Sequence, residues 1–121
     1  MGQLEAVLKR LFTSYFAKSQ KQPLAVAISV TPPWWNRGLA YCAVLAPTAE
    51  LVKAYKSGTM SEEEYSKAYV ELLNSRGVTP EQVVETLPDG AVLLCYEKAG
   101  DFCHRHLAAK WLGAAAIITE L

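Results

Sequence analysis

The stretch from Ala91 to Leu112, AVLLCYEKAGDFCHRHLAAKWL, constrains the fold of this 121-residue chain more than any other. It opens with a short apolar run that ends at Cys95 and suits a strand covered on both faces. A turn follows, and Asp101 is placed to cap a helix that begins at Phe102 and that Gly113 ends. A strand, a turn and a helix in this order are typical of a βα unit in a parallel sheet.

Other short apolar runs repeat the strand signal. Leu24 to Val30 is rich in β-branched residues and stops at two prolines, which cannot continue a ladder. Ala114 to Thr119 predicts the last strand. Leu39 to Leu45 fits either a strand or irregular chain lying on the core.

Helical patterns lie between these runs. Apolar residues in Gln3 to Ala17 recur at a spacing that predicts an amphipathic helix. Pro47-Thr48 opens a helix that ends near Ser57-Gly58. Ser61 with Glu64, and Thr79 with Gln82, are capping boxes that start two further helices, the first with a buried stripe of tyrosines and leucines.

Helices that alternate with short apolar strands predict an α/β fold, a three-layer sandwich with a short, mostly parallel sheet. We expect one domain over residues 1–121, with an N-terminal amphipathic helix in 1–20 and the sheet core in 24–121. Right-handed crossovers would place the chain after Val30 and the chain after Cys95 at the same edge of the sheet. The Pro-Pro-Trp-Trp loop should then face the Cys-Tyr-Glu turn, where α/β folds bind ligands.

Composition excludes some classes of function. Twelve basic residues balance twelve acidic ones, which argues against binding to extended nucleic acid but leaves room for a nucleotide-sized ligand. The N-terminus lacks the apolar region of a secretory signal, and no apolar run reaches membrane-spanning length. Three cysteines, an odd count, in a domain that needs no disulfide predict a reducing, cytoplasmic location. The oligomeric state is left open.

Reactive side chains gather where the strand meets the helix. A helix N-terminus favours the thiolate of Cys103, His104 could act as base for Cys103 or Cys95, and Arg105 could hold an anion bidentately. Glu97 could pair with Arg105, orient His104 or act as a general base. The plainer interpretation is also open: free cysteines are often small core residues, and Glu97 could be a solvated turn residue.

Trp34 and Trp35 follow the prolines at a strand end, and either could form an aromatic wall for a planar ligand or simply cover the sheet. Zinc bound by Cys95, Cys103 and His104, with Cys42 or Glu97 as fourth ligand, is an alternative to thiol chemistry. The spacing disfavours it, because there is no Cys-x-x-Cys motif and adjacent ligands rarely aim at one ion. Phosphate-binding and hydrolase motifs are absent from the sequence.

The segment LLCYEKAGDFCHRHLAAKWL resembles the signature of the domain of unknown function 488 family. Members of that family carry a cysteine, a nearby glutamate and then a Cys-His-Arg triplet that opens a helix. The Pro-Pro-Trp-Trp loop, Ala46-Pro47, the Tyr-Lys-Ser-Gly segment at 55–58 and the helix around Glu64 to Tyr69 are similar to that family too. The resemblance covers about Ala25 to Leu112. It implies an α/β domain of cytoplasmic prokaryotic or viral origin and carries no known activity.

The residues and the resemblance lead to one leading hypothesis and two alternatives. In the first, a pocket at the carboxyl edge of the sheet binds a small anionic or nucleotide-like ligand, with Arg105 and Trp34 or Trp35 as binding residues. Thiol-dependent chemistry there would use Cys95 or Cys103 with His104 and Glu97, and no cofactor. The alternatives are a non-enzymatic structural or regulatory module, and a zinc-stabilised domain.

Overall fold

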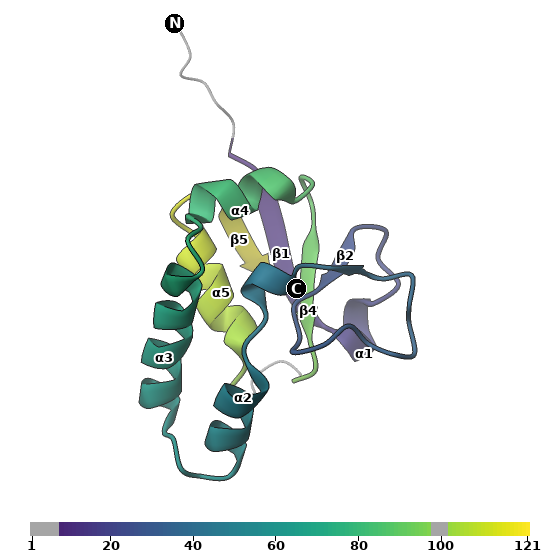
Figure 1. Ribbon diagram of the computed structural model, residues 1–121. Coiled ribbons are helices and arrows are strands. Elements are labelled where there is room, and N and C mark those ends of the chain that lie inside the picture. Colours follow the sequence, from purple (N-terminus) through teal and green to yellow (C-terminus); the bar gives the residue numbers. More distant parts are fainter. Residues whose placement is uncertain (1–7, 98–101) are drawn as a thin grey trace, which may run out of the picture.

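The computed structural model describes residues 8–97 and 102–121 of the chain. Within these residues, one sheet has the strand order β3-β2-β4-β1-β5 (Figure 1). The strands are β1 at Arg10–Tyr15, β2 at Ala25–Ala27, β3 at Ala40–Tyr41, β4 at Val92–Cys95 and β5 at Ile117–Glu120. All paired strands run parallel, so their carboxyl ends share one edge of the sheet. The predicted α/β class with a parallel sheet is confirmed.

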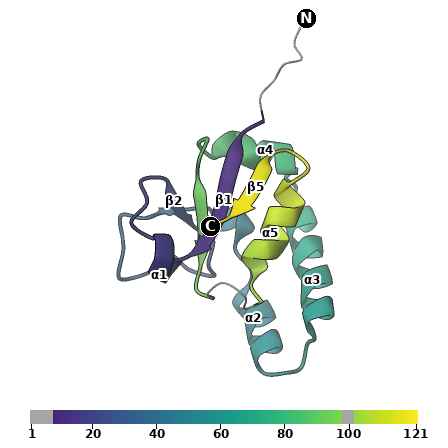
Figure 2. The same ribbon diagram turned by 180° about the vertical axis from the view of Figure 1, so that it is seen from behind.

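Helices lie on both faces of this sheet, but unequally. They are α1 at Phe16–Ser19, α2 at Ala49–Lys56, α3 at Glu62–Ser75, α4 at Pro80–Thr86 and α5 at His104–Leu112, with a 3-10 turn at Ala43–Leu45. Figures 1 and 2 show α3 and α5 on one side of the strands and the short α1 on the other. The two outer layers of the sandwich are therefore a thick helical layer and a thin one made by α1 and its neighbouring loop.

Both predicted capping boxes are present. The Ser61 hydroxyl accepts a hydrogen bond from the Glu64 amide, and the Glu64 carboxylate accepts one from the Ser61 amide. Thr79 and Gln82 make the same reciprocal pair at the start of α4. These contacts are local, which is why sequence spacing alone locates them.

The N-terminal amphipathic helix predicted from Gln3 to Ala17 is wrong over its described part, where residues 10–15 form β1 instead. Residues 1–7 lie outside the described residues. β1 pairs with β4 on one side and β5 on the other, so both of its edges make ladder hydrogen bonds. Leu11, Thr13 and Ser14 are completely or almost completely buried. A short apolar run satisfies both helical and strand spacing, and pairing with two distant strands decides between them.

The larger core lies between the sheet and α3, α4 and α5. It includes Leu11, Leu93, Tyr69, Val83 and Leu112. A smaller cluster on the other face joins Phe16 of α1 to alternate residues of β2 and β4. The carboxyl edge of the sheet is thus covered by helices on one face and largely by loop on the other.

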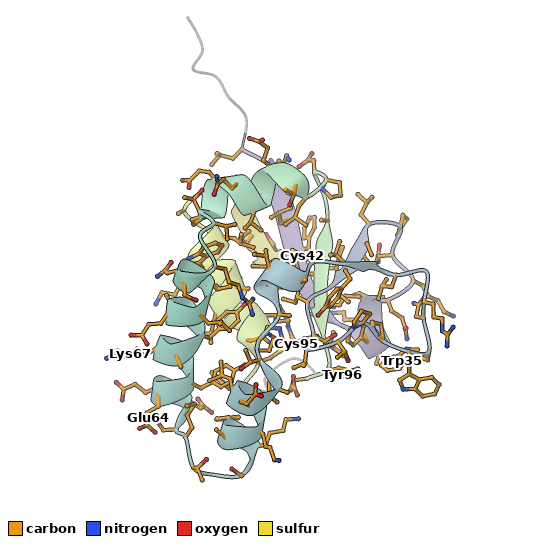
Figure 3. All side chains as sticks on the ribbon, viewed as in Figure 1. Trp35, Cys42, Glu64, Lys67, Cys95 and Tyr96 are labelled. Carbon is orange, nitrogen blue, oxygen red and sulfur yellow. A yellow bond between two sulfur atoms is a disulfide. The ribbon has the colours of Figure 1, made fainter. Side chains whose placement is uncertain are left out.

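The predicted convergence at the carboxyl edge is confirmed. The Ile28 amide, just after β2, donates a hydrogen bond to the Leu94 carbonyl in β4 at 2.9 Å. The rings of Trp35 and Tyr96 lie 5.7 Å apart between centroids, so the tryptophan loop does meet the turn after Cys95. Figure 3 shows these two side chains next to each other, on the side of Cys95 away from α3.

Several element boundaries differ from the sequence-based expectations, and β2 covers only Ala25–Ala27 of the run predicted from Leu24 to Val30. The ambiguous run at 39–45 divides into the two-residue β3 and the 3-10 turn. β5 starts at Ile117 rather than Ala114. The helix expected from Phe102 begins at His104, with Cys103 in the N-cap position, and the proposed cap Asp101 lies outside the described residues.

Candidate functional site

The two cysteines of the predicted cluster lie at the junction of strand and helix. Cys95 is the last residue of β4 and Cys103 immediately precedes α5; both are almost completely buried. Their sulfur atoms are joined as a disulfide, with Cα atoms 7.4 Å apart. The sequence predicted free thiols here, and the folding of β4 against α5 brings the two sulfurs together. Thiol chemistry at either sulfur therefore requires the reduced form.

His104 is the first residue of α5 and is also buried. Its Nε2 lies 2.6 Å from the Ile28 carbonyl oxygen. Because that oxygen can only accept, Nε2 carries the proton and the neutral ring presents the Nδ1 lone pair, 3.7 Å from the Cys103 sulfur. Burial lowers the pKa of His104 to about 4, although the bond to Ile28 partly opposes this. The ring is neutral at neutral pH.

Arg105 is fully buried and turns away from His104. Its Nε and Nη2 atoms donate hydrogen bonds to the Glu120 carboxylate at 2.8–3.2 Å. Its Nη1 atom donates to the Cys95 sulfur at 3.1 Å and to the Glu97 carbonyl. Burial alone would raise the pKa of Glu120, but hydrogen bonds from Arg105 and Thr13 hold it below its ordinary value.

This arrangement does not favour the predicted role of Arg105 as an anion clamp. Each of its three guanidinium nitrogens donates to a protein group, and its side chain borders neither of the cavities beside the cysteines. The predicted pairing with the Glu97 carboxylate is absent as well, because Glu97 contributes its backbone carbonyl and the carboxylate partner is Glu120. Arg105 instead connects β4, β5 and α5.

Glu97 has a different charged partner. Its carboxylate lies 3.5 Å from the Lys56 Nζ at the end of α2, and the Lys56 side chain is 64% exposed. Such a solvated pair contributes little to stability. Both side chains are therefore available to a ligand.

A cavity of about 470 Å³ lies between α2, α3 and the start of α5, and we call it the site cavity. Cys103 and His104 border it, together with Lys56 and Glu97. Its remaining lining is mainly aromatic, and the members are Val52, Tyr55, Glu62, Tyr65 and Phe102. The ring centroids of Phe102 lie 5.0 Å from Tyr55 and 5.4 Å from Tyr65, so these rings form a continuous wall.

A smaller hollow of about 190 Å³ adjoins the site cavity and shares Val52, Lys56, Glu97 and His104 with it. Its lining also includes Cys95 and the chain that follows β2 at residues 29–31. Together the two hollows place four of the predicted residues, Cys95, Glu97, Cys103 and His104, around one connected region. Trp34, Trp35 and Arg105, the other residues of the predicted site, do not line these hollows.

The tryptophans are not part of this region. Trp34 is 79% exposed and Trp35 42% exposed, and neither lines the two hollows. Trp35 packs edge-on against Phe16 and Tyr96 on the thin side of the sheet. The wall predicted from Trp34 or Trp35 is therefore not found at these hollows, and the aromatic residues that line the site cavity come from α2, α3 and Phe102.

Sequence reasoning missed several residues that make the site. Tyr65 was assigned to the core alone, and Glu120 was overlooked as the partner of Arg105. Tyr55 and Lys56 were quoted only as part of a family-like segment. The family resemblance was the only feature of the sequence that singled these two residues out, because a tyrosine and a lysine at the end of a helix match no structural motif.

The buried atoms of Cys95, Cys103 and His104 also form the one group among the described residues that could hold a metal. Their ligand atoms all lie within 4.8 Å of one another. Cys42, named above as a fourth ligand, lies apart from them beside Val44 and Val83. No helix among the described residues has the length and apolar character to cross a membrane.

The chain belongs to the DUF488 family of α/β domains. A family model described as "DUF488-N3a: Active DUF488-N3 subclade" matches residues 15–116, which include β4, α5 and every residue of the cysteine–histidine cluster. No curated protein and no solved structure gives a significant match to the chain.

Proposed function

We propose that this protein binds a small, planar anionic ligand, such as a nucleotide, in the site cavity and acts on it through the cluster of Cys95, Cys103 and His104. The observation that carries this proposal is the lining of the cavity. Reactive groups at the start of α5 form one part and aromatic rings form another. Lys56, exposed and paired with Glu97, supplies a cation beside the carboxylates of Glu62 and Glu97.

The dimensions and chemistry of the cavity support a small molecule. About 470 Å³ falls within the range of roughly 300–1,000 Å³ that is typical of ligand pockets. Tyr55, Tyr65 and Phe102 offer faces and edges on which a planar group can stack. Lys56 replaces Arg105 as the residue that we expect to contact the anion. The word "Active" in the description of the family model is consistent with catalysis.

His104 and Cys103 are the groups that would react. The neutral imidazole presents Nδ1 to the Cys103 sulfur, and both residues border the cavity, so Nδ1 can accept a proton there. Glu97, on the edge of both hollows, is placed to orient the ligand or Lys56. The chemistry needs reduced sulfurs, so we propose a reducing compartment such as the cytoplasm as its location.

Ligand binding tests the proposal directly. A panel of nucleotides and simple aromatic phosphates is titrated into the reduced protein by calorimetry, and we expect at least one to bind. Lys56→Ala should weaken that binding about tenfold or more, whereas Lys53→Ala, an exposed lysine in the same last turn of α2, should not. Equal affinities for the two variants would contradict the role of Lys56, and no binding by any member would contradict the ligand class.

A second candidate, a structural or regulatory module, is favoured by one observation. Arg105 joins three elements through Glu120, Cys95 and the Glu97 carbonyl, without facing a cavity. In this case the cluster would hold the domain together and no ligand would protect Cys103. Alkylation of the reduced protein with and without the best-binding ligand, read by mass spectrometry, separates the two, with Cys42 as internal reference.

A further inference from the structure

We propose that the reduced chain binds a zinc ion through Cys95, Cys103 and His104, with its fourth coordination position facing the site cavity. The inference rests on the proposed function and makes it more specific, because it assigns the two sulfurs as metal ligands rather than as free nucleophiles. The number and type of ligands match catalytic zinc sites, which use three protein ligands and keep one position open.

Once the disulfide is reduced and the two sulfurs move apart from their bonded distance, the spacing of the ligand atoms fits one ion. Zinc–sulfur bonds of about 2.3 Å and zinc–nitrogen bonds of about 2.0 Å place tetrahedral ligands roughly 3.5–3.8 Å apart. The Cys103 sulfur lies 3.7 Å from the His104 Nδ1, and all three atoms lie within 4.8 Å of one another. The Cα atoms of the cysteines are 7.4 Å apart, beyond the roughly 4.4–6.8 Å usual for disulfides. The backbone therefore holds the two residues at a separation that suits two ligands of one ion.

The local backbone explains how adjacent residues can both be ligands. Cys103 is extended, with φ −153° and ψ 147°, and His104 begins the helix. The change from extended to helical backbone turns the two side chains toward each other instead of to opposite sides. The sequence-based objection to adjacent ligands is therefore removed by the N-cap geometry.

The surroundings of the ligands support the same conclusion. Metal-binding histidines usually donate their second ring N–H to a carbonyl or carboxylate, which fixes the ring and its tautomer. His104 does this with the Ile28 carbonyl. Arg105 Nη1 lies 3.1 Å from the Cys95 sulfur and would stabilise its thiolate form. Neither contact is needed for a pair of inert core cysteines.

The open position can face the ligand. Cys103 and His104 border the site cavity, and Cys95 and His104 border the adjoining hollow, so the centre of the cluster lies at their junction. Water or an atom of the bound anion could complete the coordination there. Zinc would act as a Lewis acid and undergo no redox change.

Loading begins with reduction of the disulfide. A phosphine supplies two electrons and becomes a phosphine oxide, with oxygen and two protons taken from water, and both cysteines become thiols. Each thiol then loses its proton to buffer as its sulfur binds the ion, and neutral His104 loses none.

The test is metal content. The phosphine-reduced full chain is loaded with Zn²⁺, freed of excess metal by gel filtration and measured by plasma mass spectrometry. We expect about one zinc per chain in the wild type and in Cys42→Ser, the matched cysteine control. Cys95→Ser, Cys103→Ser and His104→Gln should each lose most of it. No zinc in the wild type, or full retention in these three variants, would overturn the proposal.

Cobalt gives a second measurement that needs no variant. Co²⁺ bound by two thiolates and one imidazole in a tetrahedral site should show sulfur-to-metal charge-transfer bands and intense visible absorption. Only weak octahedral absorption by the reduced wild type would overturn the site. Lys56→Ala should keep its zinc while it loses anion affinity. Failure of metal binding is thus distinguishable from failure of the proposed ligand pocket.

Discussion

His104 and Arg105 are neighbours at the start of α5, and both are buried, yet they serve opposite sides of the molecule. His104 reaches toward β2, where it bonds the Ile28 carbonyl, and keeps Nδ1 beside the cavity. Arg105 reaches toward β1 and β5, where it bonds Glu120 and lies 5.8 Å from the centre of the Tyr15 ring. Two adjacent residues of one helix therefore differ in surroundings: His104 borders the site cavity, and Arg105 is bonded to protein groups only.

Burial has different consequences for these two neighbouring polar side chains. The polar atoms of Arg105 are satisfied by the protein, as buried charges require. His104 has one satisfied nitrogen and one that faces sulfur and the cavity. The Cys-His-Arg triplet is therefore divided between two roles: Cys103 and His104 border the site cavity, and Arg105 bonds β4 and β5.

The largest expected effect on stability comes from removing the Arg105 side chain, which bonds β4 and β5. Arg105→Ala should destabilise the fold by about 3–5 kcal/mol, because Glu120 and the Glu97 carbonyl lose their partner inside the protein. Urea unfolding measures this change, with the exposed Arg37→Ala as control. The interpretation of Arg105 as an anion-binding residue would instead predict a loss of ligand affinity. A loss below about 1 kcal/mol would restore that earlier interpretation.

Acid should lower the stability of the fold through protonation of His104. The pKa of His104 is about 4 in the fold and about 6.5 when unfolded, so its contribution is complete above pH 6.5 and is lost as pH falls toward 4. The lost stability is on the order of 3 kcal/mol. Unfolding with a chelator present, for wild type and for His104→Gln, measures it. Equal pH slopes between 6.5 and 4 would show that His104 is not held neutral.

A smaller effect is expected at the partner of Arg105. Glu120→Gln keeps an acceptor but removes the negative charge, and we expect a loss of about 1–2 kcal/mol because the carboxylate is one-third exposed and partly screened. Thermal unfolding of the single variants and of the double variant with Arg105→Ala gives the coupling. Additive losses would mean that the two residues do not act as a pair.

The smallest change in stability should follow Lys56→Ala. The ion pair with Glu97 is solvated, so we expect no measurable change in the free energy of unfolding together with the loss of anion binding described above. A clear destabilisation, measured by calorimetry, would show that Lys56 has a structural role as Arg105 does.

Short-range patterns predicted much of this molecule. The capping boxes at Ser61 and Thr79 depend on residues three positions apart, and the apolar run before Cys95, which follows a turn at Pro88-Asp89-Gly90, favours a covered strand. The meeting of the two loops at the carboxyl edge follows from parallel strands and the handedness of their connections. The sequence also predicted which residues cluster around Cys103 and His104.

Tertiary structure alone decided β1, the bond between Cys95 and Cys103, the partner of Arg105 and the residues that line the cavity. β1 is a strand because β4 and β5, about 80 and 107 positions away in register, pair with its two edges. Arg105 faces Glu120 rather than a ligand because the first turn of α5 points it toward β5. Local pattern fixes what depends on neighbouring residues, whereas the direction and partners of a buried polar side chain depend on elements brought from far along the chain.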